Sequence, residues 1–79
     1  MSEAAQVRKL MKKRADAHAD AGYLVSMADA RWFVLEICRE AEVDRPPPDS
    51  LECLASELVR LTLEAYEGST TRLRLRRAQ

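Results

Sequence analysis

The sequence predicts a small all-α domain of three helices, at about residues 2–21, 26–42 and 50–67, followed by a basic C-terminal extension. Three observations support this prediction. Apolar residues recur at steps of three and four along each expected helix. Ala, Leu, Glu and Arg, which favour helices, are abundant, and β-branched and aromatic residues are few. The glycines and prolines fall between or after these segments, where helices are expected to end.

The first expected helix has Ser2 as a candidate N-cap and Gly22 just past its end, where a left-handed cap is favoured. Its apolar face is thin, because mostly alanines follow Val7 and Met11. We therefore expect this helix to bury little area and to approach a neighbouring helix closely. A single histidine, His18, lies near its end and is expected to be a surface or boundary residue rather than a ligand or a pH switch.

The second expected helix opens with Ser26 and Asp29 in the spacing of a capping box. Its core stripe is predicted to comprise Ala30, Phe33, Val34, Ile37 and Ala41. Trp32 and Leu35 fall outside this stripe, on a side that they share with charged residues. A helix that is apolar on more than one side is either central in the fold or contacts another molecule. Trp32 therefore either covers the first or third helix or forms a contact with a partner.

Residues 43–48, with the sequence VDRPPP, end the second helix, because consecutive prolines cannot continue it. They are expected to form a stiff, extended spacer that sets the angle into the third helix. A proline-rich ligand for an aromatic groove is the alternative, although no PxxP repeat extends the run.

The third expected helix is the most strongly patterned element of the chain. Its core stripe is predicted to comprise Leu51, Leu54, Leu58, Leu61 and Ala65. Asp49 and Glu52 stand in capping-box spacing at its start, and Gly68 suits a C-terminal cap. Such a wide apolar stripe has to be covered by the rest of the chain or by a second copy.

The domain organisation is expected to be a helical domain at 1–68 and a basic tail or strand at 69–79. Leucine and arginine alternate between residues 71 and 76, which is the period of a β-strand. No second strand pattern exists for it to pair with in the same chain. The tail is therefore expected to pair with its own copy, to add to the edge of a partner's sheet, or to be a mobile basic segment.

Length and composition limit the class of protein. A domain of 79 residues buries only about 60 % of the surface of its unfolded chain, so a homodimer is expected. No stretch resembles a signal peptide or a membrane span, and we expect a cytoplasmic location with Cys38 and Cys53 as free thiols.

Charge is unevenly distributed although its formal sum is zero. Residues 1–22 carry five basic and three acidic side chains, residues 23–67 carry four and ten, and residues 68–79 carry four and none. The basic ends either contact the acidic middle of the same chain or of a partner subunit, or they contact a polyanion. Phosphate contacts in the second case would come from Arg8, Lys9, Lys12, Lys13, Arg72, Arg74, Arg76 and Arg77.

Residues for catalysis, cofactors or metals are not recognisable. The single histidine lacks the partners of a catalytic triad, and the two glycines form no phosphate-binding loop. A zinc site built from His18, Cys38 and Cys53 would lack the usual close ligand spacing. We therefore expect no catalytic residues, no cofactor, no metal and no small-molecule substrate.

The sequence thus favours a non-catalytic protein–protein interaction module, a small adaptor, regulator or inhibitor of the kind found in phages and plasmids. Its contacts are expected at Trp32, Leu35, Leu73 and Leu75, with another protein or its own copy as the partner. The alternative is a nucleic-acid-binding regulator that uses its two basic ends for phosphate contacts. Base-specific reading by a helix-turn-helix is not indicated, because the helix after the Gly22 turn is apolar and has a net charge of −2.

Overall fold

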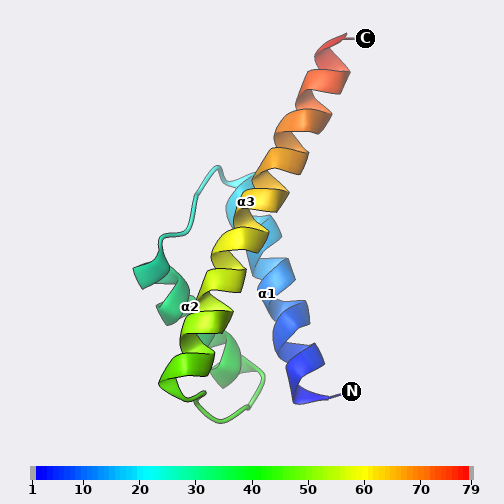
Figure 1. Cartoon of the computed structure of the whole chain (residues 1–79). Coiled ribbons are helices and arrows are strands. Elements are labelled where there is room, and N and C mark those ends of the chain that lie inside the picture. Colours follow the sequence, from blue (N-terminus) through cyan, green and yellow to red (C-terminus); the bar gives the residue numbers. More distant parts are fainter. Residues whose placement is uncertain (1, 79) are drawn as a thin grey trace.

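Three helices form the fold: α1 (Glu3–Asp20), α2 (Met27–Glu40) and α3 (Pro48–Ala78). The computed structural model describes the backbone of residues 2–78 and the side chains of residues 2–68. α1 and α3 run in the same direction, and α2 runs the opposite way (Figure 1). Residues 2–78 contain no strand, so the prediction of an all-α, three-helix domain is confirmed.

The ends of α1 and α2 follow the signals in the sequence. The hydroxyls of Ser2 and Ser26 accept hydrogen bonds from the backbone N–H groups three residues later, at 3.2 Å each, so both N-caps are confirmed. Gly22 adopts a φ of 74° directly after α1, and the next N–H, that of Tyr23, donates to His18 O at 2.8 Å. α1 therefore ends in the left-handed cap that a glycine favours.

The end of α2 uses a cap of the same kind without a glycine. Glu42 has a φ of 58°, and the N–H of Val43 donates to Cys38 O at 2.9 Å. α2 consequently ends at Glu40, two residues before the predicted boundary. The backbone N–H groups that follow α2 thus pair with the carbonyls of Ile37, Cys38 and Arg39, even though a non-glycine residue occupies the left-handed conformation.

α3 begins two residues earlier than the sequence predicts. Pro48 is its first residue, and Pro47 O accepts from the N–H of Leu51 at 2.8 Å. A proline is well suited to the first helical position, because its fixed φ is helical and no partner for its missing N–H is needed there. Asp49 therefore does not cap the helix. It lies inside the first turn, where its negative charge interacts favourably with the helix dipole.

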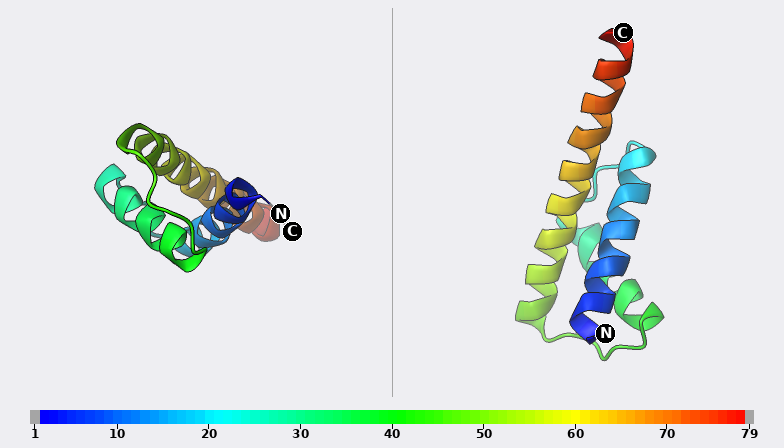
Figure 2. Two further views of the ribbon diagram at one scale, coloured as in Figure 1. Left: turned by 90° about the horizontal axis from the view of Figure 1, so that it is seen from below. Right: turned by 90° about the vertical axis from the view of Figure 1, so that its right-hand side faces the viewer.

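α3 also continues through Gly68 to Ala78, whereas the sequence suggests an end at residue 67 with Gly68 as the cap. With 31 residues it is about 46 Å long, which accounts for the 48 Å long axis of the molecule. Its C-terminal part projects beyond α1 and α2, and the two termini lie at opposite ends (Figures 1 and 2). The boundary between residues 68 and 69 thus falls within one helix, and strand formation by residues 71–76 on pairing stays a prediction.

The core lies between α3 and the other two helices, and α1 packs mainly against α3. Side chains that are almost fully enclosed come from all three helices: Met11, Ala15, Ala30, Val34, Ile37, Ala55, Leu58 and Thr62. The hydroxyl of Thr62 donates to Leu58 O at 2.8 Å, so this buried polar group has a partner. Leu58 is the only member of the predicted α3 stripe that is fully buried, because α1 and α2 cover α3 along the line of Ala55 and Thr62.

Candidate interaction surfaces

Trp32 lies on the outer face of α2, with 59 % of its surface exposed. It is two residues from Val34 and five from Ile37, which are both buried, so it points away from the core. The side chains of α1 and α3 leave most of the ring uncovered, so Trp32 does not serve as a cover for either helix, and its contact with a partner stays a prediction. An exposed tryptophan is uncommon, because this side chain offers a large apolar surface.

Leu35 is half-buried and lies three residues after Trp32, so the two side chains share one side of α2. Arg31 stands at the edge of this side, where its Nε and Nη2 donate to the carboxylate of Glu52 on α3, at 2.5 and 3.3 Å. This two-bond contact holds α2 against the start of α3. The Trp32–Leu35 face therefore belongs to a helix fixed on the bundle at one edge.

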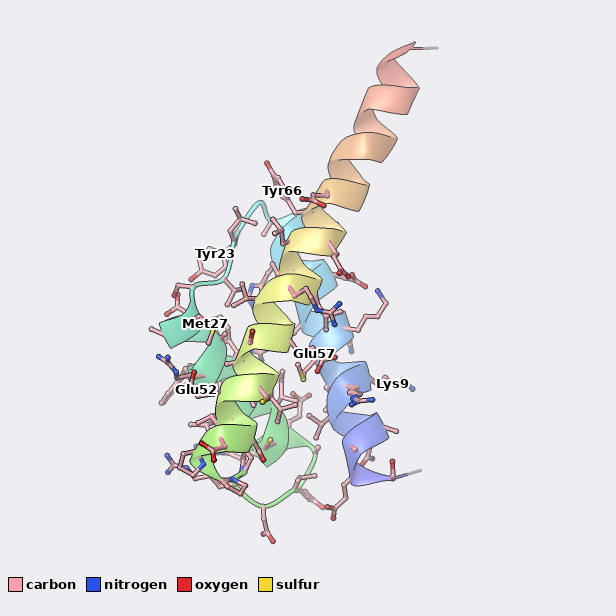
Figure 3. All side chains as sticks on the ribbon, viewed as in Figure 1. Lys9, Tyr23, Met27, Glu52, Glu57 and Tyr66 are labelled. Carbon is pink, nitrogen blue, oxygen red and sulfur yellow. The ribbon has the colours of Figure 1, made fainter. Side chains whose placement is uncertain are left out.

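A second candidate surface is the basic face of α1. Arg8, Lys9, Lys12 and Lys13 are all exposed, and Lys12 forms a pair with Asp16 one turn later, at 3.7 Å. The fifth basic residue of the run does not join this surface, because Arg14 Nη1 donates to Glu36 Oε2 on α2 at 2.8 Å. In Figure 3, Lys9 lies on the half of the molecule opposite the projecting end of α3.

The remaining predicted contact residues fall where only the backbone is described. These are Leu73 and Leu75 for protein contacts and Arg72, Arg74, Arg76 and Arg77 for phosphate contacts. Their backbone belongs to the projecting part of α3, and their side chains lie outside the described residues. The roles assigned to them from the sequence stay predictions.

A third candidate surface, which is apolar, was not singled out by the sequence. Leu63 and Tyr66 are 45 % and 39 % exposed on α3, at the point where this helix leaves the bundle. They are three residues apart and therefore share one side of the helix. Leu63 lies among Arg60, Glu64 and Glu67, all of which are exposed. The sequence feature that could have identified this site is Leu63 itself, an apolar residue on the charged side of the strongly amphipathic helix α3.

His18 is a packing residue between α1, the following loop and α2. Its ring stacks on Phe33, with the centroids 4.8 Å apart, and Tyr23 tilts against it at 5.4 Å. Burial and the neighbouring Arg14 guanidinium lower the pKa of His18. Its Nε2 is buried without a hydrogen-bond partner among the residues described, so the neutral ring is favoured here. This is the boundary position that the sequence suggests.

The two cysteines differ in exposure, and one of them lines a surface depression. Cys38 is buried and Cys53 is exposed on α3; both are free thiols, and burial raises the pKa of Cys38. Cys38 lines a shallow apolar depression of about 240 Å³ together with Val7, Val43 and Leu54. Within residues 2–68, no three His, Cys, Asp or Glu side chains are grouped as a metal site would need.

Comparisons with known proteins add no relative: no family model, curated protein or solved structure matches this chain. The described helices include none that is both long and apolar enough to cross a lipid bilayer. The candidate surfaces are consequently interpreted from their own geometry and chemistry.

Proposed function

We propose that this chain is a non-catalytic protein–protein interaction module that binds a partner through the outer face of α2. The observation that supports the proposal is the exposure of Trp32, at 59 %, on a helix whose other side forms the core. Tryptophan is among the residue types most enriched at the energetic centres of protein interfaces. A small adaptor, regulator or inhibitor would act through such a face.

The chemistry around Trp32 defines the kind of partner. Ala28 and Leu35 extend an apolar strip along the helix, and Arg31, Glu36 and Arg39 flank it with both signs of charge. An apolar centre with a mixed polar rim fits a protein surface that offers an apolar pocket for one indole ring. Covering the exposed part of a tryptophan stabilises a complex by about 3 kcal/mol, which corresponds to roughly a 100-fold change in Kd.

The proposal predicts that Trp32→Ala weakens partner binding far more than folding. Because the ring makes few contacts with its own chain, the free energy of unfolding should fall by less than about 1 kcal/mol. Leu24→Ala is a matched control, since Leu24 is 54 % exposed but lies in the loop before α2. The partner should be recovered with the wild type and with Leu24→Ala but not with Trp32→Ala. In a binding measurement with purified proteins, Trp32→Ala should then have a lower affinity for this partner than the wild type.

Trp32 is the only tryptophan, so its fluorescence reports on this face alone. Binding at the outer face of α2 should shift its emission to shorter wavelength as water is excluded from the ring. A partner that binds without changing this emission, or a Trp32→Ala variant that unfolds but binds normally when folded, would contradict the proposal.

A second candidate function, binding of nucleic acid, is supported by the four exposed cations of α1. Phosphate contacts by Arg8, Lys9, Lys12 and Lys13 would weaken steeply as salt concentration rises. Fluorescence anisotropy of a random-sequence duplex and of a single strand, titrated at several salt concentrations, tests this directly. Lys9→Glu/Lys13→Glu should abolish binding while Trp32→Ala leaves it unchanged, and absence of binding at low salt would exclude this function.

A further inference from the structure

The exposed apolar residues of α3 lie at the middle of that helix. Leu63 and Tyr66 are 45 % and 39 % exposed, and α3 extends from Pro48 to Ala78. The part of α3 between Leu51 and Thr62 packs against α1 and α2, whereas the helix beyond Gly68 projects from the bundle (Figures 1 and 2). An apolar pair therefore marks the point at which α3 passes from a packed to an unpacked environment.

The charge of α3 changes sign at the same point. Between Asp49 and Glu67 the sequence carries five acidic residues and one basic residue, and from Gly68 to the end it carries four arginines and no acid. Because α3 is one continuous helix, these two charged halves are held apart along a single axis. The basic half consequently cannot fold back on the acidic half of its own chain.

We propose that two copies of this chain associate through antiparallel pairing of their α3 helices, about a two-fold axis between Leu63 and Tyr66. In this arrangement Leu63 of each copy packs against Tyr66 of the other, and the basic half of each helix lies along the acidic half of its partner. Parallel pairing would bring like charges together, which is unfavourable. Charge complementarity thus favours one orientation and a second copy as the occupant.

The spacing of charged residues agrees with this axis. Glu52 stands 11 residues before Leu63, and Arg77 stands 11 residues after Tyr66. Eleven residues are slightly more than three full helical turns, so both positions return to the side of α3 that carries Leu63 and Tyr66. Antiparallel pairing therefore brings Glu52 of one copy level with Arg77 of the other. The Glu52 side chain is 51 % exposed beside Arg31, which leaves its carboxylate accessible to a second guanidinium.

Self-association through α3 is separate from the proposed use of Trp32, because that residue lies on the outer face of α2. Each dimer would present two copies of the Trp32 face and could bind two partner molecules. Failure of either proposal therefore leaves the other testable, and the fluorescence of Trp32 distinguishes them.

The mass of the full chain across a dilution series, measured by sedimentation or light scattering, tests the pairing. The wild type should change from dimer to monomer on dilution, and more readily at high salt, because screening weakens the interhelical charge pairs. Leu63→Glu should shift the protein to monomer by placing two carboxylates at the axis. Gln6→Glu adds the same charge to an exposed position of α1 and should leave the dimer intact.

Cross-linking tests the orientation of the two helices. Cys53 is exposed on α3, and antiparallel pairing brings it close to residue 78 of the other copy. An Ala78→Cys variant treated with a short thiol cross-linker should give a Cys53-to-position-78 linkage between copies, which Cys53→Ser removes. Predominance of Cys53-to-Cys53 linkage would indicate parallel pairing and overturn the proposal.

Four further results would overturn it. The chain could be monomeric at every concentration, or the dimer could persist in Leu63→Glu. Alternatively, the dimer could dissociate in Trp32→Ala while the wild type shows a concentration-dependent shift of Trp32 emission, which would assign self-association to α2. Finally, the chain alone could stay monomeric and bind a different protein, and Leu63→Glu could abolish that binding. This result would assign the α3 surface to the other protein.

Discussion

His18 of α1 stacks on Phe33 of α2, with 4.8 Å between the ring centroids, and the Arg14 guanidinium lies 5.2 Å from the centre of the same phenyl ring. Arg14 in turn donates to Glu36 at 2.8 Å. Two side chains of α1 thereby enclose one aromatic ring of α2. This group joins α1 directly to α2, two helices that pack mainly against α3.

The stability of the fold should depend on pH through His18. Burial and the charge of Arg14 lower the pKa of His18 in the folded state, so the unfolded chain takes up a proton first as pH falls. The free energy of unfolding should therefore be constant above about pH 7.5 and should decrease as pH falls through about 6.5, the pKa of an unperturbed histidine.

Urea denaturation at a series of pH values between about 5 and 8, the range in which a histidine titrates, checks this expectation. His18→Phe retains a ring against Phe33 and should remove the dependence in this window. The other charged groups at this site are Lys13, Arg14, Glu36 and Glu40, and all four are retained in the variant, so only the group at position 18 changes. A pH dependence that persists in His18→Phe would contradict the assignment.

Replacement of the two glycines by alanine should change the free energy of unfolding in opposite directions. At Gly22, with a φ of 74°, a side chain is strained, so Gly22→Ala should lower the free energy of unfolding by about 1 kcal/mol. At Gly68, inside α3, alanine removes a poor helix former, and Gly68→Ala should raise helix content and stability by about 0.5–1 kcal/mol. An added Cβ meets nothing within 4 Å at either position, so backbone conformation alone decides the sign.

Circular dichroism and thermal unfolding of the two variants measure this difference. Gly68→Ala is the decisive one, because it also tests the continuity of α3. If α3 ended at residue 67 with Gly68 as a left-handed cap, the alanine variant would be less stable than the wild type.

The two thiols should differ greatly in reactivity. Cys53 is exposed, whereas Cys38 is 3 % exposed and has a pKa raised by burial, which lowers its thiolate fraction. A thiol reagent should label Cys53 rapidly in the native protein and Cys38 only as the fold opens. Rapid labelling of both in the native state, compared with Cys53→Ser as the control, would show that the core around Cys38 opens easily.

Local signals in the sequence predicted several parts of the fold correctly. Ser2 and Ser26 cap their helices, and Gly22 ends α1, because these residues act through their own backbone neighbourhood. The position of Trp32 outside the core stripe of α2 followed from periodicity alone, and its exposure agrees with that. What periodicity could not decide was whether another helix would cover it.

The differences between sequence and structure arise where one residue type suits two conformations. Gly68 can end a helix or lie within it at a cost of about 1 kcal/mol relative to alanine, which flanking helix formers can offset. Pro48 can interrupt a helix or occupy its first position. Leu63 was missed because the apolar pattern of α3 is wide, and only the placement of α1 and α2 shows which part of it remains uncovered.

The packing of α1 against α3 has a consequence for how the chain folds during synthesis. The principal partner of α1 is α3, which is made after both other helices of the bundle, and α1 and α2 share few contacts of their own. The N-terminal half should therefore leave the ribosome as a loosely structured segment that cannot bury Met11 or Val34 until α3 follows. Folding is expected to be a late and concerted event that requires nearly the whole chain, and products truncated before residue 48 should be degraded rather than accumulate as partly active fragments.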